Sequence, residues 1–385
     1  MVENKDKKVL NVPNLRFKEF EGEWEKCKLG DVCNTSTGNK NTQDKTDDGI
    51  YPFYVRSQTV ERINSWTFDG EAILTAGDGV GVGKVFHHTY GKIGVHQRVY
   101  ILSDFKCDAN YLFHFFSSKF YNRVKRMSAK NSVDSVRKEM ITDMPLSLPC
   151  CQEQIKIGYM LSILDERIAT QNKIIEDLKK LKCAIIENVL NNCHDNKMRL
   201  GDVGIYIRGL TYSSNDVVEQ KGTIVMRSNN IVSGGLLDYC NNVVRVNKQI
   251  LQEQQLQNGD IVICMANGSS ALVGKTSFYD GKCLSPITVG AFCGIYRSKM
   301  PITKWLFQTN RYHRYIWNSL QGGNGAIANL NGEDILRMSF PTPDKSTIGH
   351  CIKLLSSLDL LIENNVSLCS MFSQQKEYLL QQMFI

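Results

Sequence analysis

A long amphipathic segment occurs twice in this chain, and no other feature limits the possible folds as strongly. From Gln152 to Asn191 the apolar residues repeat at heptad spacing, which predicts one long helix with a continuous seam. Adding 194 to each residue number gives a second seam, and its polar interruptions fall at the matching places, Gln171 with Asn365 and Lys182 with Lys376. Two unrelated helices would not share their interruptions, so the segment is duplicated.

The seam residues are expected to pair the two helices with each other. A helix of about 38 residues is about 57 Å long, and an exposed apolar seam of that length is unfavourable in water. Antiparallel pairing would bury both seams and relate the two halves by a pseudo-twofold axis, with a polar layer at Gln171 and Asn365 that fixes the register. The alternative is that each helix packs on its own domain. The predicted pairing residues are Leu161, Leu164, Ile168, Gln171, Ile175, Leu178, Leu355, Leu358, Ile362, Asn365, Cys369 and Phe372.

The repeat extends beyond the helices. The shift of 194 holds without a gap back to Tyr111 and Trp305, and it relates the Pro-ended segments MPLSLP (144–149) and MSFPTP (338–343). An identical LGDV occurs at 29–32 and again at 200–203, only 171 residues later. The two halves are therefore copies that differ in length in their middles, which fits a duplicated domain and helix better than a solenoid.

Each half reads as a mixed α+β domain followed by its helix. Short β-like runs are broken by Gly and Asn, and one amphipathic helix follows them in each half. The expected strands are 51–57, 71–75, 84–87 and 95–102 in the first half and 222–227, 260–265 and 286–292 in the second, with helices at 111–127 and 304–320. The predicted organisation is a first domain at 1–149 with a frayed lead-in at 1–12, a central helix at 150–191, a linker and second domain at 192–343, and a C-terminal helix at 344–385.

The composition is typical of a water-soluble protein with a modest excess of positive charge. The formal net charge is +7 at pH 7, which is compatible with a polyanion partner. No apolar run approaches the length of a bilayer span and residues 1–10 are too polar for a signal peptide, so we expect no membrane association and a cytoplasmic location. The 13 cysteines show no CxxC pair and no zinc-ligand spacing, so we expect reduced thiols and no metal site.

No catalytic constellation is evident. The stretch Gly268–Thr276 resembles a phosphate-binding loop, but five residues separate its glycines where the motif needs four, and no helix pattern follows it. The glycine string 77–83 also lacks the following helix and the acidic partner of a cofactor loop. We therefore predict no catalytic residues and no cofactor, and favour binding as the function.

Residue types that contact phosphates and base edges recur at strand ends and loops in both halves. Arg56-Ser57, for example, stands at a place that matches Arg227-Ser228. Any one such residue is commonly a solvated surface group, and the recurrence supports the set. The candidate DNA-binding residues are Arg56, Ser57, Gln58, Lys84, His87, His88, Gln97, Arg98, Lys125, Arg126, Lys130, Asn131, Arg208, Arg227, Ser228, Asn229, Asn230, Asn267, Lys275, Arg311, Arg314 and Asn324.

The layout resembles the specificity (S) subunits of type I restriction-modification systems over nearly the whole chain. The resemblance is carried by VPNLRF and CKLGDV within Val12–Val32, the second LGDV, the two Pro-ended segments, and the helices with Leu164-Asp165 and Leu358-Asp359. One departure is the start of the second helix, where Ser346-Thr347-Ile348-Gly349 stands in place of Gln152-Glu153-Gln154-Ile155, so docking on that side could differ.

The resemblance implies that each domain is a target recognition domain that reads one part of a bipartite sequence in double-stranded DNA. It further implies that the helices set the spacing and dock two methyltransferase subunits, with restriction subunits joining that core. The methyl donor and ATP would then bind to the partners. Because the two domains differ in most candidate contacts, an asymmetric target is expected. Two alternatives remain, a free-standing DNA methyltransferase or nuclease and a non-catalytic protein scaffold.

Overall fold

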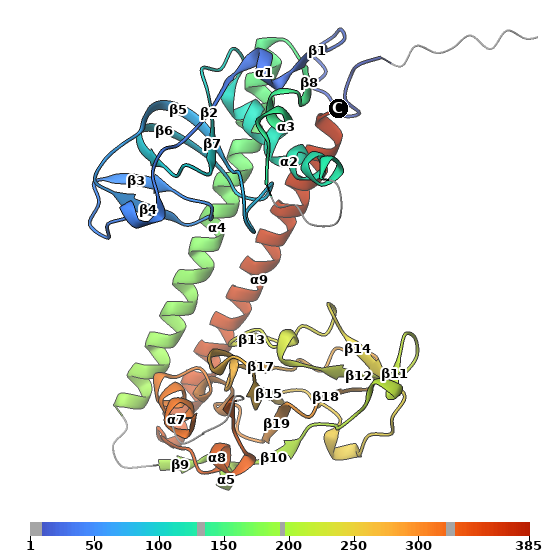
Figure 1. Cartoon of the computed structure of the whole chain (residues 1–385). Helices are drawn as coiled ribbons and strands as arrows, with labels where there is room; N and C mark the ends of the chain where they lie inside the picture. The colour runs from blue at the N-terminus through green and yellow to red at the C-terminus, as the bar shows by residue number, and fades with distance from the viewer. Residues whose placement is uncertain (1–9, 129–134, 193–196, 321–327) are drawn as a thin grey trace, which may run out of the picture. The chain divides into compact units, whose positions relative to one another are not determined.

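The computed structural model describes residues 10–128, 135–192, 197–320 and 328–385 and divides the chain into two compact units (Figure 1). The first unit comprises Met1–Lys173 and Val366–Ile385, and the second comprises Ile174–Asn365. Each unit therefore contains one α+β domain and a segment of both long helices, and the boundary between the units falls inside the helices. The candidate residues Lys130, Asn131 and Asn324 lie outside the described residues.

The first unit is built on a six-stranded sheet with the order β2-β7-β5-β6-β3-β4. Its strands are β2 (Asn34–Thr37), β3 (Tyr51–Tyr54), β4 (Val60–Ile63), β5 (Phe68–Ala76), β6 (Phe86–Val95) and β7 (Val99–Ser103). A separate antiparallel pair joins β1 (Glu25–Lys28) to β8 (Pro145–Leu148). The helices are α1 (Leu29–Val32), α2 (Ala109–Met127), α3 (Lys138–Thr142) and the first part of α4 (Cys151–Asn191).

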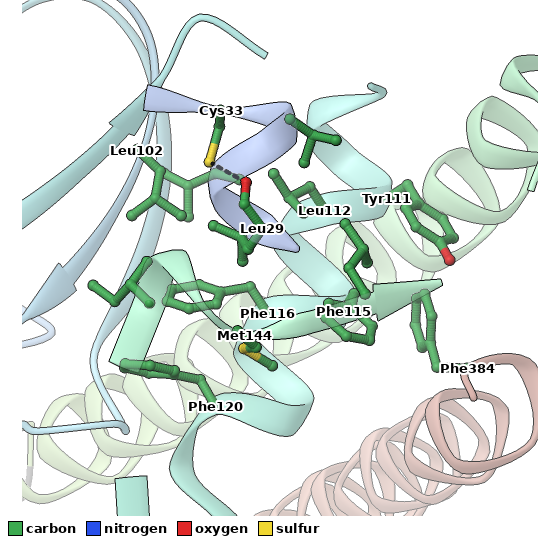
Figure 2. Close-up of a cluster of buried hydrophobic side chains, with 14 of the residues drawn as sticks. Leu29, Cys33, Leu102, Tyr111, Leu112, Phe115, Phe116, Phe120, Met144 and Phe384 are labelled. Carbon is green, nitrogen blue, oxygen red and sulfur yellow. Dashed lines mark hydrogen bonds between the residues drawn. The ribbon is translucent and has the colours of Figure 1, made fainter. Parts of the chain in front are cut away.

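Aromatic side chains from α2 fill the main core of the first unit (Figure 2). Phe116 and Phe120 pack together with a ring-centroid distance of 4.5 Å. Phe384, which follows α9 (Lys345–Met383), lies 5.2 Å from Tyr111 between ring centroids. The end of the second long helix is therefore anchored in the core of the first unit (Figure 2).

The second unit has the same kind of elements in two larger sheets and two strand pairs. The five-stranded sheet has the order β10-β19-β15-β17-β13 and the four-stranded sheet the order β11-β14-β12-β18, while β16 pairs with β20 and β21 with β9. The strands of the five-stranded sheet are β10 (Gly204–Arg208), β13 (Gly235–Leu236), β15 (Ile261–Cys264), β17 (Thr276–Phe278) and β19 (Cys293–Ser298). The other strands are β9 (Lys197–Arg199), β11 (Val217–Val218), β12 (Thr223–Met226), β14 (Val244–Val246), β16 (Ala266–Asn267), β18 (Ile287–Val289), β20 (Ala328–Asn329) and β21 (Ser339–Pro341). The helices are α5 (Leu200–Val203), α6 (Thr303–Leu306), α7 (Asn310–Leu320), α8 (Gly332–Leu336) and the remaining parts of α4 and α9.

The two LGDV sequences form the same structure in both units. Each is a one-turn helix, α1 or α5, whose leucine is fully buried. The Leu29 amide donates to the Met144 carbonyl at 2.9 Å, and the Leu200 amide donates to the Met338 carbonyl at the same distance. Because Met144 and Met338 are themselves 194 apart, the motif joins the start of each domain to its Pro-ended segment.

Segments of α4 and α9 lie side by side and run in opposite directions within each unit (Figure 1). In the first unit the Lys376 ammonium donates to the Asp165 carboxylate, and in the second the Lys182 ammonium donates to the Asp359 carboxylate at 2.9 Å. Adding 194 converts one pair into the other with the two helices exchanged. The predicted fold class, α+β domains with two long paired helices, is confirmed.

The predicted seam is the face that the helices bury. In the first unit Leu161, Leu164 and Gln171 are buried, and Cys369 and Phe372 are half-buried. In the second unit Ile175, Leu355, Leu358 and Ile362 are buried, while Leu178 and Asn365 are half-buried. Ile168 is also half-buried. Within the described residues no helix is both long and apolar enough to cross a bilayer.

Two expected elements are interrupted for local reasons. The helix expected at 304–320 is two helices, because the Thr309 hydroxyl accepts from the Tyr312 amide at 3.1 Å and starts a new helix, α7. The strand expected at 95–102 is broken at residues 96–98. There the Val99 amide donates to the His96 carbonyl at 2.9 Å, and the Arg98 amide donates to His96 Nδ1 at 3.0 Å. The resulting turn between β6 and β7 projects Gln97 and Arg98 from the sheet.

Candidate nucleic-acid interface

Three loop positions meet at one edge of the first unit, namely Arg56 after β3, Asp78 after β5 and Arg98 in the β6–β7 turn. The Asp78 carboxylate accepts from Arg56 Nη1 at 2.8 Å and lies 3.7 Å from Arg98 Nε. The Arg98 side chain is 64% exposed and that of Arg56 is 44% exposed. We call these three residues the first-unit edge. It presents two guanidinium groups, both within 4 Å of one carboxylate.

The second unit has a hollow of about 650 Å³ at the corresponding place. Ser228 after β12, Ala266 after β15 and Phe292 in the β18–β19 turn line it, and we call these three residues the second-unit edge. Phe292 is 66% exposed and also lines a second hollow of about 540 Å³ that includes Arg208. The second-unit edge therefore consists of a small polar, a small apolar and an aromatic side chain, and it lacks the ion pairs of the first-unit edge.

Strand pairing establishes that the two edges are equivalent. In the parallel pair β3–β6 Tyr54 is opposite Val95, and in the parallel pair β12–β18 Met226 is opposite Val289. Val95 and Val289 differ by 194, so the constant shift extends further back than residues 111 and 305. All four strands end at these residues, and the loops that follow them contain the edge residues.

The same backbone bond closes both turns. The Gly77 amide donates to the Arg98 carbonyl at 2.7 Å, and the Met265 amide donates to the Phe292 carbonyl at 2.9 Å. Arg98 is therefore equivalent to Phe292, and Asp78, which follows Gly77, is equivalent to Ala266. Counting two residues on from Tyr54 and from Met226 pairs Arg56 with Ser228.

The sequence-based match of Arg56 with Arg227 is therefore wrong by one residue, because Arg56 is equivalent to Ser228. The shift of 171 between the LGDV motifs applies through Thr37 and Arg208, which occupy equivalent positions opposite β7 and β19. The shift becomes 172 at β3 and β12. The second unit therefore has one more residue between Arg208 and β12 than the first unit has between Thr37 and β3. Arg227 instead follows Met226 directly and donates from Nη2 to the Asn242 carbonyl at 3.3 Å.

Asn230 does not lie on the surface, which corrects its place among the candidate contacts. It is only 1% exposed. Its amide nitrogen donates to the Asp238 and Asn241 carbonyls, and its oxygen accepts from the Arg227 amide. The side chain holds two loops together and is unavailable to a ligand.

Several other candidates are engaged within their own unit. His87 is half-buried, and burial lowers its pKa, so the imidazole is neutral at pH 7. His88 Nε2 lies 2.9 Å from Glu71 Oε1. Arg311 Nε donates to the Ser339 carbonyl at 2.9 Å, and Asn267 donates to the Ser228 hydroxyl at 3.2 Å.

The remaining candidates are more accessible. Gln97 is exposed and donates to Asn41 Oδ1 at 2.6 Å, close to the first-unit edge in the chain. Lys275 is half-buried. The other exposed candidates are Ser57, Gln58, Lys84, Lys125, Arg126, Arg208, Asn229 and Arg314. Of these, Asn229 lines the hollow of about 650 Å³, together with Arg227 and Asn267.

Sequence reasoning missed three residues of the edges, Asp78, Ala266 and Phe292. One is acidic and two are apolar, whereas the candidates were chosen among basic and polar residue types. The repeat contains the signal that could have identified Phe292, because adding 194 to Arg98 gives that residue. Asp78 has no such signal, since β5 and β15 are offset by a different amount.

Part of the chain is similar to a known protein family. Residues 21–180 match the family model described as the type I restriction modification DNA specificity domain. This part of the chain is therefore similar to a type I restriction modification DNA specificity domain. The predicted resemblance to specificity subunits is thereby confirmed.

Known specificity subunits are similar to the chain over part of their length. The type I restriction enzyme EcoDI specificity subunit of Escherichia coli is 27% identical over 173 residues, 44% of this chain and 38% of that protein. The MjaVIII specificity subunit of Methanocaldococcus jannaschii is 29% identical over 192 residues, 45% of this chain and 44% of that protein. The matched regions thus span less than half of either relative.

The fold similarity extends further than the sequence similarity. A crystal structure of the S subunit of a type I restriction-modification system from M. genitalium aligns with a TM-score of 0.64 at 14% identity, covering 97% of this chain and 99% of that one. The specificity domain match at 21–180 includes the first-unit edge and the first part of α4. The second-unit edge lies outside this match, and the strand register described above makes it equivalent to the first-unit edge.

Proposed function

We propose that this chain is the DNA-reading subunit of a type I restriction-modification complex and has no catalytic activity of its own. Each α+β domain reads one half of a bipartite, asymmetric target in double-stranded DNA. The observation that carries the proposal is the pair of equivalent edges with unlike chemistry, Arg56, Asp78 and Arg98 in one unit and Ser228, Ala266 and Phe292 in the other. Duplicated readers with different side chains at the same positions suit two different half-sites.

The long helices set the spacing of the two readers and dock two methyltransferase subunits, and restriction subunits join that core. This part of the proposal is supported by apolar side chains that stay exposed on the helices, including Ile155, Tyr159, Leu354, Leu360 and Met371. Exposed apolar surface on a soluble domain commonly marks a protein interface. The methyl donor and ATP are bound by the partner subunits, so the chain itself needs no cofactor.

The complex is expected to work in a reducing compartment, the cytoplasm. All cysteines in the described part of the chain are free thiols, including the adjacent and exposed Cys150 and Cys151. Extracellular proteins with this many cysteines commonly form disulfides.

Binding of the purified full-length chain to random-sequence duplexes at several salt concentrations tests the DNA-reading role. A protein that neutralises several phosphates loses affinity steeply as salt rises, by about 10³ to 10⁵ between 50 and 200 mM for 6 to 10 contacts. We expect at least a hundredfold loss over that range. Absence of binding, or binding that does not depend on salt, would favour the scaffold alternative.

Calorimetry with S-adenosylmethionine separates the enzyme alternative from the proposed one. We expect no heat of binding with the chain alone and a saturable signal once methyltransferase subunits are added. Saturable binding to the chain alone would indicate a free-standing methyltransferase.

A further inference from the structure

The two equivalent edges differ in a way that predicts which base pair each one reads. On the basis of the proposed function, we propose that Arg98 reads a guanine in the half-site of the first unit and that Phe292 reads the methyl group of a thymine in the half-site of the second. The two residues stand at the same position of the repeat, so they would reach corresponding places in the two half-sites.

The first-unit edge has the donors and the acceptor that a G·C pair requires. In the major groove guanine presents two acceptors, O6 and N7, and cytosine presents the N4 amino donor. Arginine is the usual partner of guanine, and a carboxylate can accept from cytosine N4. Arg98 and Asp78 place a guanidinium fork and a carboxylate side by side, with Arg98 Nε 3.7 Å from the carboxylate.

The same carboxylate argues against a phosphate contact at this position. Asp78 lies within 4 Å of both guanidinium groups and offsets part of their charge. A phosphate oxygen that approached the arginines would be repelled by the carboxylate. Asp78 is thus a positioning residue for Arg56 and Arg98.

The second-unit edge replaces every charged group by a small or apolar one. Ala266 takes the place of Asp78 and Ser228 that of Arg56, and Phe292 is exposed beside Gly290 and Ala291 in the hollow. Thymine differs from cytosine in the major groove by its 5-methyl group, which apolar side chains such as Phe contact.

Two side-chain amides line that hollow, those of Asn229 and Asn267, and the amide of Asn267 is already engaged. Asn267 donates from its amide nitrogen to the Ser228 hydroxyl at 3.2 Å. Its oxygen accepts from the Ser269 amide at 3.0 Å. A bidentate contact with adenine would require both of these groups at once.

Exchange of the two residues tests the assignment. The full-length chain is mixed with a library of randomised duplexes, and the bound fraction is sequenced for the wild type, Arg98→Phe and Phe292→Arg. We expect Arg98→Phe to replace one G·C preference in one half-site by A·T, and Phe292→Arg to do the reverse in the other half-site. Each exchange should alter the base preference at its position by about fivefold or more.

Two further variants keep the test decisive. Lys125→Ala removes one exposed positive charge from α2 outside the edge, and it should lower affinity for all sequences without changing the motif. If Arg98→Phe does not fold by circular dichroism, Arg98→Gln removes the charged fork, and it should also lose the guanine preference. An Arg98 variant that weakens binding equally on every sequence would make Arg98 a phosphate contact and overturn the inference.

The outcomes also separate this inference from the proposed function. A wild-type chain that selects a motif which neither exchange alters refutes the base assignment and leaves the DNA-reading role intact. A wild-type chain that enriches no motif refutes both.

Discussion

His114 shows how a single buried residue couples the first domain to its helix. It lies on α2, its Nδ1 is 3.7 Å from Asp165 Oδ2 on α4, and its Nε2 is 3.3 Å from the Ser162 hydroxyl. Burial lowers the pKa of His114 to about 3, and the positive charge of Lys376 acts in the same direction. The Asp165 carboxylate is already bonded to Lys376, so it does little to favour the imidazolium.

This depressed pKa predicts acid sensitivity with a definite sign. The unfolded chain takes up a proton at His114 below about pH 6.5, whereas the folded chain does so only near pH 3. Stability from this group is therefore present above pH 6.5 and falls as the pH is lowered towards 3, by up to about 1.4 kcal/mol per pH unit.

Urea unfolding of the wild type and His114→Gln at pH 7 and pH 5 measures this effect. Glutamine is the residue that the repeat places at the equivalent position, Gln308. We expect the variant to lose less stability than the wild type between the two pH values. An identical loss in both proteins would mean that the folded chain protonates His114 as readily as the unfolded chain does.

At the scale of elements, the two ion pairs between the long helices have the same origin but different surroundings. Asp359 is buried and accepts from Lys182 at 2.9 Å and from the Trp305 indole at 3.0 Å, and it lies 2.7 Å from Lys304. Burial alone would raise the pKa of Asp359, but the two lysines outweigh it and keep the pKa below its ordinary value. Asp165, its repeat equivalent, is 38% exposed.

Removal of each carboxylate should therefore have unequal consequences. Asp359→Asn leaves two lysine ammonium groups beside a neutral amide, one of them fully buried, and breaking a buried pair in this way costs about 3–5 kcal/mol. The matched variant Asp165→Asn should cost less, because Asp165 and Lys376 are only half-buried and water can solvate the group that is left. Urea denaturation gives both free energies. Equal losses would show that burial does not set the strength of these pairs.

The elements also show what could be predicted from the sequence. The heptad seam and its shared interruptions were sufficient to locate both long helices and their pairing faces, because a helical period extends over many residues. The β6–β7 turn was not predicted, since the bonds that close it involve the His96 ring and carbonyl and leave the β-like pattern of 95–102 unchanged. The equivalence of Arg56 and Ser228 likewise depends on strand register, which a one-residue insertion hides in the sequence.

At the scale of the whole molecule, the two halves are copies of one domain and helix that differ at their edges. The common elements, LGDV, the Pro-ended segments and the paired helices, keep the same bonds in both units. The edges keep their backbone positions and change their side chains. A protein built in this way would read two different sequences with one architecture.

Methylome sequencing of cells that carry this chain together with its methyltransferase subunits tests that claim most directly. We predict a methylated motif of two unlike half-sites separated by a spacer of fixed length, with a G·C pair read by one domain and an A·T pair by the other. A palindromic motif, or a continuous one without a spacer, would contradict the account.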